Sequence, residues 1–371
     1  MRYWVFVFVL ALISFGFSGV LYIVRDFDYV VQGTETAQLE VGFNRMLGKV
    51  QPEDFELLFV GDVMLSRGVG AQMLRRQDFY YPFRRIALTL RGADFVFANL
   101  EGPISNRGIN QGSEYSFRAD PRVVDGLKFA GFDVLSLANN HALDWGREAM
   151  FDTIDILETN DVYTAGAGEN LDLANQPAVL CVEDGTSKYI EISRYRDSEM
   201  SRYRDGEILG YRDGENFCSG ISVAVFAYTN LYPLGLVAKE DYSGVSDFRL
   251  VRILKDIRAI RDEVDFVVVS YHWGEEYAEE SNEEQSMLAH AIIDAGADFI
   301  IGHHPHVVQE IEKYKDGWIA YSLGNFVFDQ DFSDETMRGA ILRVLVRDGR
   351  VFSVEELGTR ISSTYQVYLG E

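Results

Sequence analysis

The chain has 371 residues, of which 47% are hydrophobic and 25% are charged, as is typical of a folded globular protein and not of a disordered one. Its 58 acidic residues outnumber the 34 basic ones, giving a formal net charge of −24. Such a field repels DNA and RNA, so we expect no nucleic-acid binding.

The first predicted element is a membrane-spanning helix. Residues 3–24 contain no charged side chain, and Arg2 and Arg25 bracket them. A helix needs roughly 20 apolar residues to cross a bilayer, so we predict a transmembrane signal anchor over residues 1–25. Arg2 places the N-terminus in the cytoplasm by the positive-inside rule. This predicts a single-pass protein of the cell membrane with an extracytoplasmic main domain. The alternative, a signal peptide cleaved near residues 18–20, also exports the domain.

Residues 26–54 are interpreted as a polar stalk, and residues 55–371 as one large domain. In this domain apolar runs alternate with helical patterns, which indicates an α/β fold with buried, largely parallel strands. The predicted strands are 55–60, 94–98, 133–138, 221–228, 265–271 and 298–301, and the predicted helices are 69–76, 121–130, 147–160, 247–263 and 283–295.

The C-terminal part has a different pattern. Residues 318–323, 337–347 and 350–358 are predicted to be consecutive strands with tight turns, and Asp348-Gly349 is a hairpin signal. We therefore expect a second, more antiparallel sheet there.

A short repeat interrupts the domain at about residues 183–220. Ser-Arg-Tyr-Arg-Asp occurs at 193–197 and again at 201–205. Units this short do not form a solenoid, so we interpret the segment as a surface insertion of strands and turns. Cys181 and Cys218, the only cysteines, flank it. They form either a disulfide or two unpaired buried thiols.

Polar side chains follow five of the predicted strands. In open α/β sheets, ligands bind beyond the carboxyl ends of the strands, so these side chains are expected to converge. Carboxylate, amide and imidazole groups together suit divalent Mn, Fe or Zn. Singly, each motif has a structural alternative: a turn, a helix cap or a buried histidine. The residues are Asp62, Glu101, Asn140, His141, His272, His303, His304 and His306, with five of the six histidines among them.

Taken in order, the motifs resemble those of the CapA family, the capsule or poly-gamma-glutamate synthesis branch of the calcineurin-like metallophosphoesterases. They are Gly-Asp-Val-Met-Leu, Asn-Leu-Glu-Gly, Ala-Asn-Asn-His-x-x-Asp-x-Gly, His-Trp-Gly-x-Glu-Tyr, His-Pro-His-Val and Tyr-Ser-Leu-Gly-Asn-Phe-x-Phe-Asp-Gln, between residues 61 and 330. The resemblance implies a four-layered α/β/β/α sandwich.

The resemblance also implies roles for individual residues. His141 is the expected general acid or the hydrogen-bond donor to a phosphoryl oxygen, because an imidazole titrates near neutral pH. Asp144 either orients His141 or begins the following helix. Glu275, Tyr277 and Asn325 are expected to line the cleft and bind substrate. The metal ligands implied are Asp62, Glu101 (bridging), Asn140, His272, His304 and His306.

Two positions depart from the phosphoesterase pattern. Met64 stands where Asp-x-His has histidine, and a thioether is a poor ligand for hard divalent metals. Glu101 replaces a shorter bridging aspartate. The site is therefore expected to hold one or two metal ions, and His303 remains an alternative to His304.

Three functions follow from the resemblance. The first is a metal-dependent hydrolase or transferase in poly-gamma-glutamate or capsule polymer synthesis. The second is a non-catalytic component that binds or exports the polymer, and the third is a general extracytoplasmic metallophosphatase. The expected partners are the cell-surface polymer or its precursor, the membrane through the N-terminal helix, and other membrane subunits of synthesis or export.

Overall fold

A computed structural model of the chain describes residues 54–183, 186–189, 211–212, 215–216, 218–231 and 234–370, which lie within one compact unit, Gln51–Glu371. In this described part, no helix is long and apolar enough to cross a membrane. The predicted anchor (1–25) and the predicted stalk up to residue 53 lie outside the described residues.

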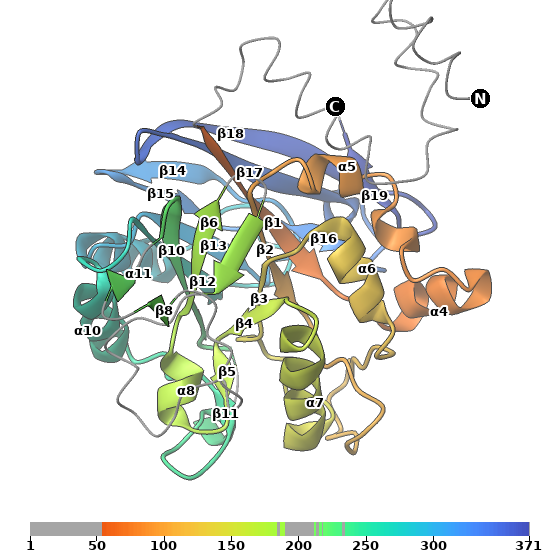
Figure 1. Cartoon of the computed structure of the whole chain (residues 1–371). Coiled ribbons are helices and arrows are strands. Elements are labelled where there is room, and N and C mark those ends of the chain that lie inside the picture. The colour runs from red at the N-terminus through yellow and green to blue at the C-terminus, as the bar shows by residue number, and fades with distance from the viewer. Residues whose placement is uncertain are drawn as a thin grey trace, which may run out of the picture. The chain divides into compact units, whose positions relative to one another are not determined.

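Two large sheets form the centre of the unit (Figure 1). The first has the order β19-β18-β17-β1-β2-β3-β4, and β16 pairs with the end of β1. Its strands β1 to β4 are parallel, whereas β17 to β19 are antiparallel. The strands are β1 (Phe55–Val63), β2 (Phe95–Leu100), β3 (Val134–Ser136), β4 (Tyr163–Ala165), β16 (Asn325–Val327), β17 (Arg338–Arg347), β18 (Arg350–Ile361) and β19 (Val367–Leu369).

The second sheet has the order β14-β15-β13-β12-β10-β6-β7. Strands β10, β12, β13 and β15 are parallel, and antiparallel strands lie at both edges. The strands are β6 (Ala178–Glu183), β7 (Thr186–Tyr189), β10 (Ile221–Thr229), β12 (Phe266–His272), β13 (Phe299–His303), β14 (Ile311–Tyr314) and β15 (Gly317–Ala320).

Short elements fill the connections. In the described part of the chain, two small pairs of strands lie outside the large sheets, and three short 3-10 helices lie in the connecting segments. They are β5 (Ala167–Gly168) with β11 (Gly244–Val245), β8 (Tyr211–Arg212) with β9 (Glu215–Asn216), η1 (Tyr81–Phe83), η2 (Leu234–Leu236) and η3 (Glu335–Met337), besides the short helices α5 (Ala87–Leu90) and α8 (Leu171–Asn175).

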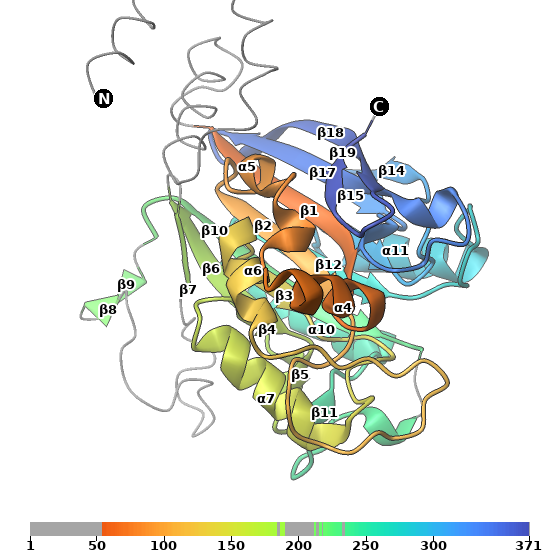
Figure 2. The same ribbon diagram turned by 90° about the vertical axis from the view of Figure 1, so that its right-hand side faces the viewer.

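Alternation along the strands explains the layers. Leu57 and Phe59 of β1 face the second sheet in one apolar cluster, while Leu58 and Val60 face helices in another. This two-residue period is what a strand buried on both faces requires. The longer helices lie in two groups on the outer faces: α4 (Arg67–Arg76), α6 (Val123–Ala130) and α7 (Gly146–Glu158) on the first sheet, and α10 (Leu250–Ile260) and α11 (Glu283–Asp294) on the second (Figures 1 and 2). The predicted α/β class is confirmed, and two mixed sheets lie between two layers of helices.

The prediction of a separate C-terminal sheet is wrong. Strands β17 and β18 extend the first sheet, because β17 pairs antiparallel with the free edge of β1, whereas β15 lies in the second sheet. Burial explains the arrangement: Ala340, Leu342 and Val344 of β17 join Leu57 and Phe59 in the cluster between the sheets.

The predicted insertion leaves the second sheet between two antiparallel neighbours, β6 and β10. At the start of the insertion, strand β7 pairs with β6. Cys181 and Cys218 form a disulfide that joins the two ends of the insertion, so the alternative of two free thiols is excluded. The repeats at 193–205 lie outside the described residues.

Candidate metal centre

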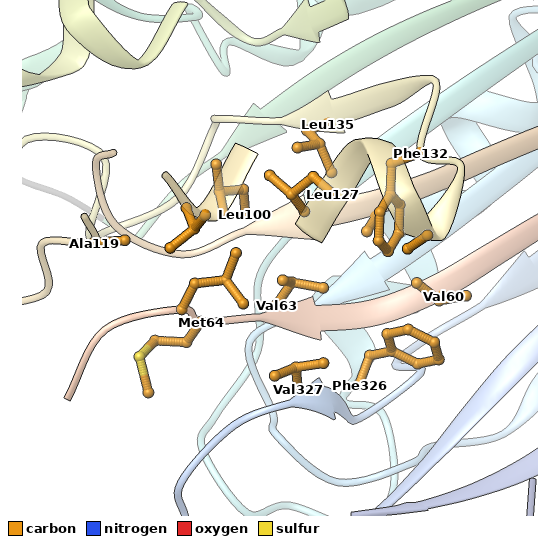
Figure 3. Close-up of a cluster of buried hydrophobic side chains, with 14 of the residues drawn as sticks. Val60, Val63, Met64, Leu100, Ala119, Leu127, Phe132, Leu135, Phe326 and Val327 are labelled. Carbon is orange, nitrogen blue, oxygen red and sulfur yellow. The ribbon is translucent and has the colours of Figure 1, made fainter. Parts of the chain in front are cut away.

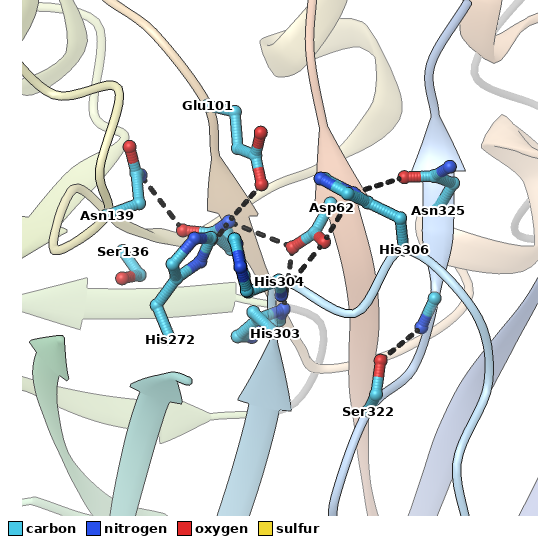
Figure 4. Close-up of polar contacts among 12 residues, drawn as sticks. Asp62, Glu101, Ser136, Asn139, His272, His303, His304, His306, Ser322 and Asn325 are labelled. Carbon is cyan, nitrogen blue, oxygen red and sulfur yellow. Dashed lines mark hydrogen bonds and ion pairs between the residues drawn. The ribbon is translucent and has the colours of Figure 1, made fainter. Parts of the chain in front are cut away.

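Strand ends from both sheets meet at one place, as the sequence predicts. Asp62 lies near the end of β1 and Glu101 directly after β2, while His272 and His303 end β12 and β13. All four residues are at most 2% exposed. Figure 4 shows their side chains pointing toward one another from the two sheets.

Asp62 is the most heavily contacted group. Its Oδ1 accepts a hydrogen bond from Asn99 Nδ2 (2.9 Å) and lies 3.1 Å from His303 Nδ1. Its Oδ2 accepts from the His304 backbone N–H (3.2 Å) and lies 3.3 Å from His306 Nδ1. Asp62 therefore connects β1 of the first sheet with the histidine turn after β13 of the second.

That turn has an unusual backbone. His304 and His306 have φ values of +97° and +59°, in the left-handed region that residues other than glycine seldom adopt. Such conformations cost on the order of 1–3 kcal/mol each and persist only where surrounding contacts enforce them. Here the hydrogen bond from the His304 N–H to Asp62 supplies one such contact.

The tautomer of His272 follows from its neighbours. Its Nδ1 lies 3.4 Å from Asn99 Nδ2, which can only donate, so Nδ1 accepts. Its Nε2 then carries the proton and donates to Asn140 Oδ1 at 2.9 Å. Two predicted ligands, Asn140 and His272, thus lie within hydrogen-bonding distance of each other.

The residues fit a divalent metal ion. Ligand atoms of Asp62, Glu101 and His272 lie within 4.8 Å of one another. Within the described part of the chain, Glu101 Oε2 and His304 Nδ1 are buried without a hydrogen-bond partner. Buried polar atoms are normally satisfied, so these two atoms are suited to binding a metal ion. Two carboxylates with imidazole nitrogens form a set that suits Mn, Fe or Zn.

The pKa values of the buried histidines are shifted in opposite directions. Burial and the charge of His306 lower the pKa of His304 to about 3, and burial also holds the pKa of His272 well below its ordinary value. Burial opposes charge on His306 too, but Glu101 and Asp62 outweigh it and raise its pKa to about 9. His272 and His304 are therefore neutral at pH 7, the state in which imidazole binds metals.

The two carboxylates also differ. Burial favours the neutral form of Asp62, yet its contacts with His303 and His306 prevail and hold its pKa well below the ordinary value. Burial raises the pKa of Glu101 to about 7. A cation beside Glu101 would favour its ionised form, as a bridging ligand requires.

His141 and Asp144 form a pair at the edge of this centre. His141 Nδ1 lies 2.8 Å from Asp144 Oδ2, and the imidazole packs against the tilted ring of Phe117 with ring centroids 4.1 Å apart. Asp144 also accepts from the Phe117 N–H and from Ser113 Oγ, both at 2.8 Å. The structure therefore places Asp144 where it can orient His141 before helix α7 begins at Gly146.

The three predicted substrate-binding residues lie in different surroundings. Glu275 is exposed, and Tyr277 is 42% exposed with its ring 6.3 Å from that of His306. Asn325 is fully buried: its Oδ1 lies 3.0 Å from His306 Nδ1, and its Nδ2 donates to Gln330 and Thr336. These contacts indicate that Asn325 holds His306 in position. Substrate binding by the three residues stays a prediction.

Met64 lies in the apolar cluster beneath the first sheet. It is fully buried beside Val63 and Val327 (Figure 3). Its sulfur accepts hydrogen bonds from the Ser66 N–H and Oγ at 3.2 and 3.0 Å. Its buried thioether thus contributes to core packing.

Three residues of the site were not among the predicted metal ligands. Asn99 contacts Asp62 and His272, and Asn139 donates to Asn99 Oδ1 at 3.1 Å. Glu276 groups with His304 and His306 as a possible ligand set, which also favours His304 over His303. Asn99 and Asn139 lie within two residues of the predicted ligands Glu101 and Asn140. Their position at the end of a predicted strand could therefore have indicated that they belong to the site.

Comparison with known proteins gives three consistent matches, one to a family and two to individual proteins. Residues 56–330 match the family described as bacterial capsule synthesis protein PGA_cap. The chain is 33% identical over 304 residues to the capsule biosynthesis protein CapA of Bacillus anthracis, covering 80% of this chain and 65% of that protein. It is 32% identical over 277 residues to the PGA biosynthesis protein CapA of Bacillus subtilis, covering 74% and 63%. The chain thus spans slightly less than two thirds of these relatives.

Among solved structures, NAD nucleotidase of Haemophilus influenzae aligns with a TM-score of 0.41 at 10% identity. The alignment covers 86% of this chain and 60% of that one.

Proposed function

Because this chain belongs to the bacterial capsule synthesis protein family PGA_cap, we propose that it acts in the synthesis of a cell-surface polymer such as poly-gamma-glutamate. We further propose that it does so as a metal-dependent hydrolase or transferase. The observation that carries the enzymatic part is the buried group of Asp62, Glu101 and His272. Glu101 Oε2 and the nearby His304 Nδ1 have no hydrogen-bond partner among the described residues.

This chain's own residues supply the rest of the proposed chemistry. Asp62, Glu101, Asn140, His272, His304 and His306 would hold one or two divalent ions. A metal bound there would lower the pKa of a water molecule and polarise a phosphoryl or carbonyl oxygen. His141, held through Nδ1 by Asp144, keeps Nε2 for proton transfer to the leaving group.

The net charge of the protein affects how it could bind an anionic polymer. At −24 the protein repels a polyanion such as polyglutamate, so binding requires a local cationic feature. A metal ion in the centre would provide one. This argument favours contact between the polymer and the strand-end edge of the sheets.

The proposed location is the outer side of the cell membrane, with residues 1–25 as the anchor. The disulfide between Cys181 and Cys218 supports this, because disulfides persist in oxidising compartments. Protease treatment of intact spheroplasts tests the location: the main domain should be digested, whereas protection until lysis would contradict it.

The enzymatic proposal is tested on the purified full chain in detergent. We expect near-stoichiometric Mn, Fe or Zn by elemental analysis, and turnover of a phosphoester or gamma-glutamyl substrate. Metal should be lost in the Asp62→Ala/His304→Ala double variant. His141→Ala should keep its metal and its thermal unfolding but lose turnover by about 10²- to 10⁴-fold.

Other outcomes identify the alternatives. Polymer binding that is unaffected by His141→Ala, without turnover of any substrate, would show a binding or export component. Hydrolysis of simple phosphoesters and nucleotides, with no preference for polymer precursors, would show a general metallophosphatase. A wild-type protein that holds no metal after reconstitution would refute the metal mechanism.

A further inference from the structure

The stretch from residue 67 to residue 93 carries a charge opposite to that of the whole protein. It contains six arginines and one acidic residue, Asp78, in a chain whose formal net charge is −24. It forms α4, η1 and α5, which pack with α6 on the outer face of the first sheet (Figure 2). None of the proposed metal ligands comes from this stretch, so its positive charge requires another explanation.

Aromatic rings hold the guanidinium groups of this surface in place. The guanidinium carbon of Arg76 lies 4.2 Å from the centroid of the Tyr81 ring, and that of Arg85 lies 3.9 Å from the Tyr368 ring. Stacking of this kind fixes the plane of a guanidinium group and leaves its N–H groups able to donate. Three further pairs are Arg84 with Tyr80 (5.6 Å), Arg91 with Phe129 (6.0 Å) and Arg122 with Phe79 (4.6 Å).

Four arginines of this surface have charges that no carboxylate neutralises. Asp78 pairs with Arg84 at 2.6 Å, and Asp120 pairs with Arg122 at 2.8 Å. The four others form no ion pair with any described carboxylate, and we call them the arginine face: Arg75, Arg76, Arg85 and Arg91. The first three are exposed and Arg91 is half-buried. Guanidinium groups that are fixed and unpaired are suited to binding carboxylates through two parallel N–H···O bonds.

Helix α4 connects the arginine face with the metal centre. Its first residue, Arg67, lies over the Phe117 ring at 5.5 Å, and the same ring packs against His141. Its last residue, Arg76, belongs to the arginine face. A helix of 10 residues is about 15 Å long, so an extended polymer of a few units is long enough to reach from the face to the centre.

We propose that the arginine face binds an anionic, carboxylate-bearing polymer and guides it to the metal centre. This rests on the proposed role in polymer synthesis, but not on the proposed metal chemistry. Charge complementarity supports it, because the acidic remainder of the protein repels such a polymer. The connection through α4 favours the polymer over an anionic membrane as the partner, because a substrate has to reach the centre and a membrane does not.

Binding of poly-gamma-glutamate to the purified full chain in detergent, measured by calorimetry, tests the proposal. The affinity of wild type should fall as salt is added. The test variant is Arg75→Gln/Arg76→Gln/Arg85→Gln/Arg91→Gln, and it should lose at least about 10-fold in affinity. The matched control removes four positive charges from exposed residues elsewhere and should lose less than about 3-fold. This control is Lys255→Gln/Arg258→Gln/Lys313→Gln/Arg350→Gln.

Unchanged affinity in the test variant would overturn the proposal, and cross-linking of the face to phosphatidylglycerol headgroups in nanodiscs would then assign it to the membrane. Equal losses in the test variant and the control would also overturn it, because net charge alone would then decide binding. Wild type that holds metal and turns over a substrate but binds no polymer would refute this proposal and leave the metal-dependent function standing. Thermal unfolding and metal content, expected to be unchanged in both variants, check that the fold and the centre are intact.

Discussion

His141 Nδ1 lies 2.8 Å from Asp144 Oδ2, and the same carboxylate oxygen accepts the Phe117 N–H. Since a backbone N–H can only donate, Asp144 has to act as an acceptor toward both groups. The proton of His141 is therefore placed on Nδ1, and Nε2 is left for the substrate. The two residues lie three apart in the chain, in the turn that precedes α7.

Asp144→Asn should lower kcat by about 10²-fold and change KM little, because an amide holds the tautomer and orientation of His141 less firmly than a carboxylate. Steady-state kinetics on the substrate identified for wild type measures this. The amide oxygen can still accept from Phe117, so thermal unfolding should change little. An unchanged kcat would mean that Asp144 only begins the helix.

Removal of metal should destabilise the fold, because the centre joins strand ends of both sheets. A ligand present at 100 times its Kd raises the free energy of unfolding by about 2.7 kcal/mol. We therefore expect chelator-treated protein to unfold at a lower temperature, and added Mn²⁺ or Zn²⁺ to restore the original value. Asp62→Asn should show a much smaller metal-dependent shift. Equal shifts in both proteins would place the stabilising ion elsewhere.

Stability should also depend on pH through Asp133, which lies outside the metal centre. Burial raises its pKa to about 7, although it accepts hydrogen bonds from Ser187 and from the Val96 N–H. The folded state thus holds this proton more tightly than the unfolded state, whose pKa is near 3.8. The stability from this group is full below that value and is lost as pH rises toward 7.

Asp133→Asn removes this titration and keeps an oxygen for the Val96 N–H. From pH 5.5 to 8, wild type should lose about 1–2 kcal/mol of unfolding free energy relative to the variant, because partial exposure reduces the full effect. Urea unfolding at several pH values measures the difference. Parallel pH curves for the two proteins would contradict the prediction.

Gly61→Ala should disrupt both the fold and the centre. A Cβ atom at Gly61 would lie 2.0 Å from the Gly324 carbonyl oxygen, which accepts the Asp62 N–H at 2.9 Å. Backbone would have to move, so we expect a loss of at least about 3 kcal/mol in urea unfolding, together with weaker metal binding. Gly235→Ala is the control, since a Cβ there meets nothing within 4 Å. A neutral Gly61→Ala would show that β1 and β16 can separate without cost.

Much of the site could be predicted because its residues stand at the ends of apolar runs. A strand buried on both faces is a local pattern, and the carboxyl ends of parallel strands lie at the same edge. Asp62, Glu101 and His272 were predicted on this basis, and the structure brings them together. The predicted strands of the α/β core correspond to observed ones, with boundaries shifted by a few residues.

Other features depended on tertiary contacts. Strands β17 and β18 have the pattern of a hairpin, but only the free edge of β1 and the apolar space beside Phe59 decide which sheet they join. The disulfide likewise required Cys181 and Cys218 to be brought within 5.5 Å between Cα atoms. Pairing partners of this kind are set by burial across long sequence separations, which local periodicity does not encode.

The same distinction holds within the metal centre. The sequence by itself determined which residue types reach the strand ends, because alternation and turn residues act over a few positions. The tertiary structure groups His304, and not His303, with Glu276 and His306 as candidate ligands, and it places Asn325 against His306. The physical reason is that these choices depend on the left-handed turn around Asp62 and on the bond from Tyr277 to Pro305, which exist only once the two sheets have packed.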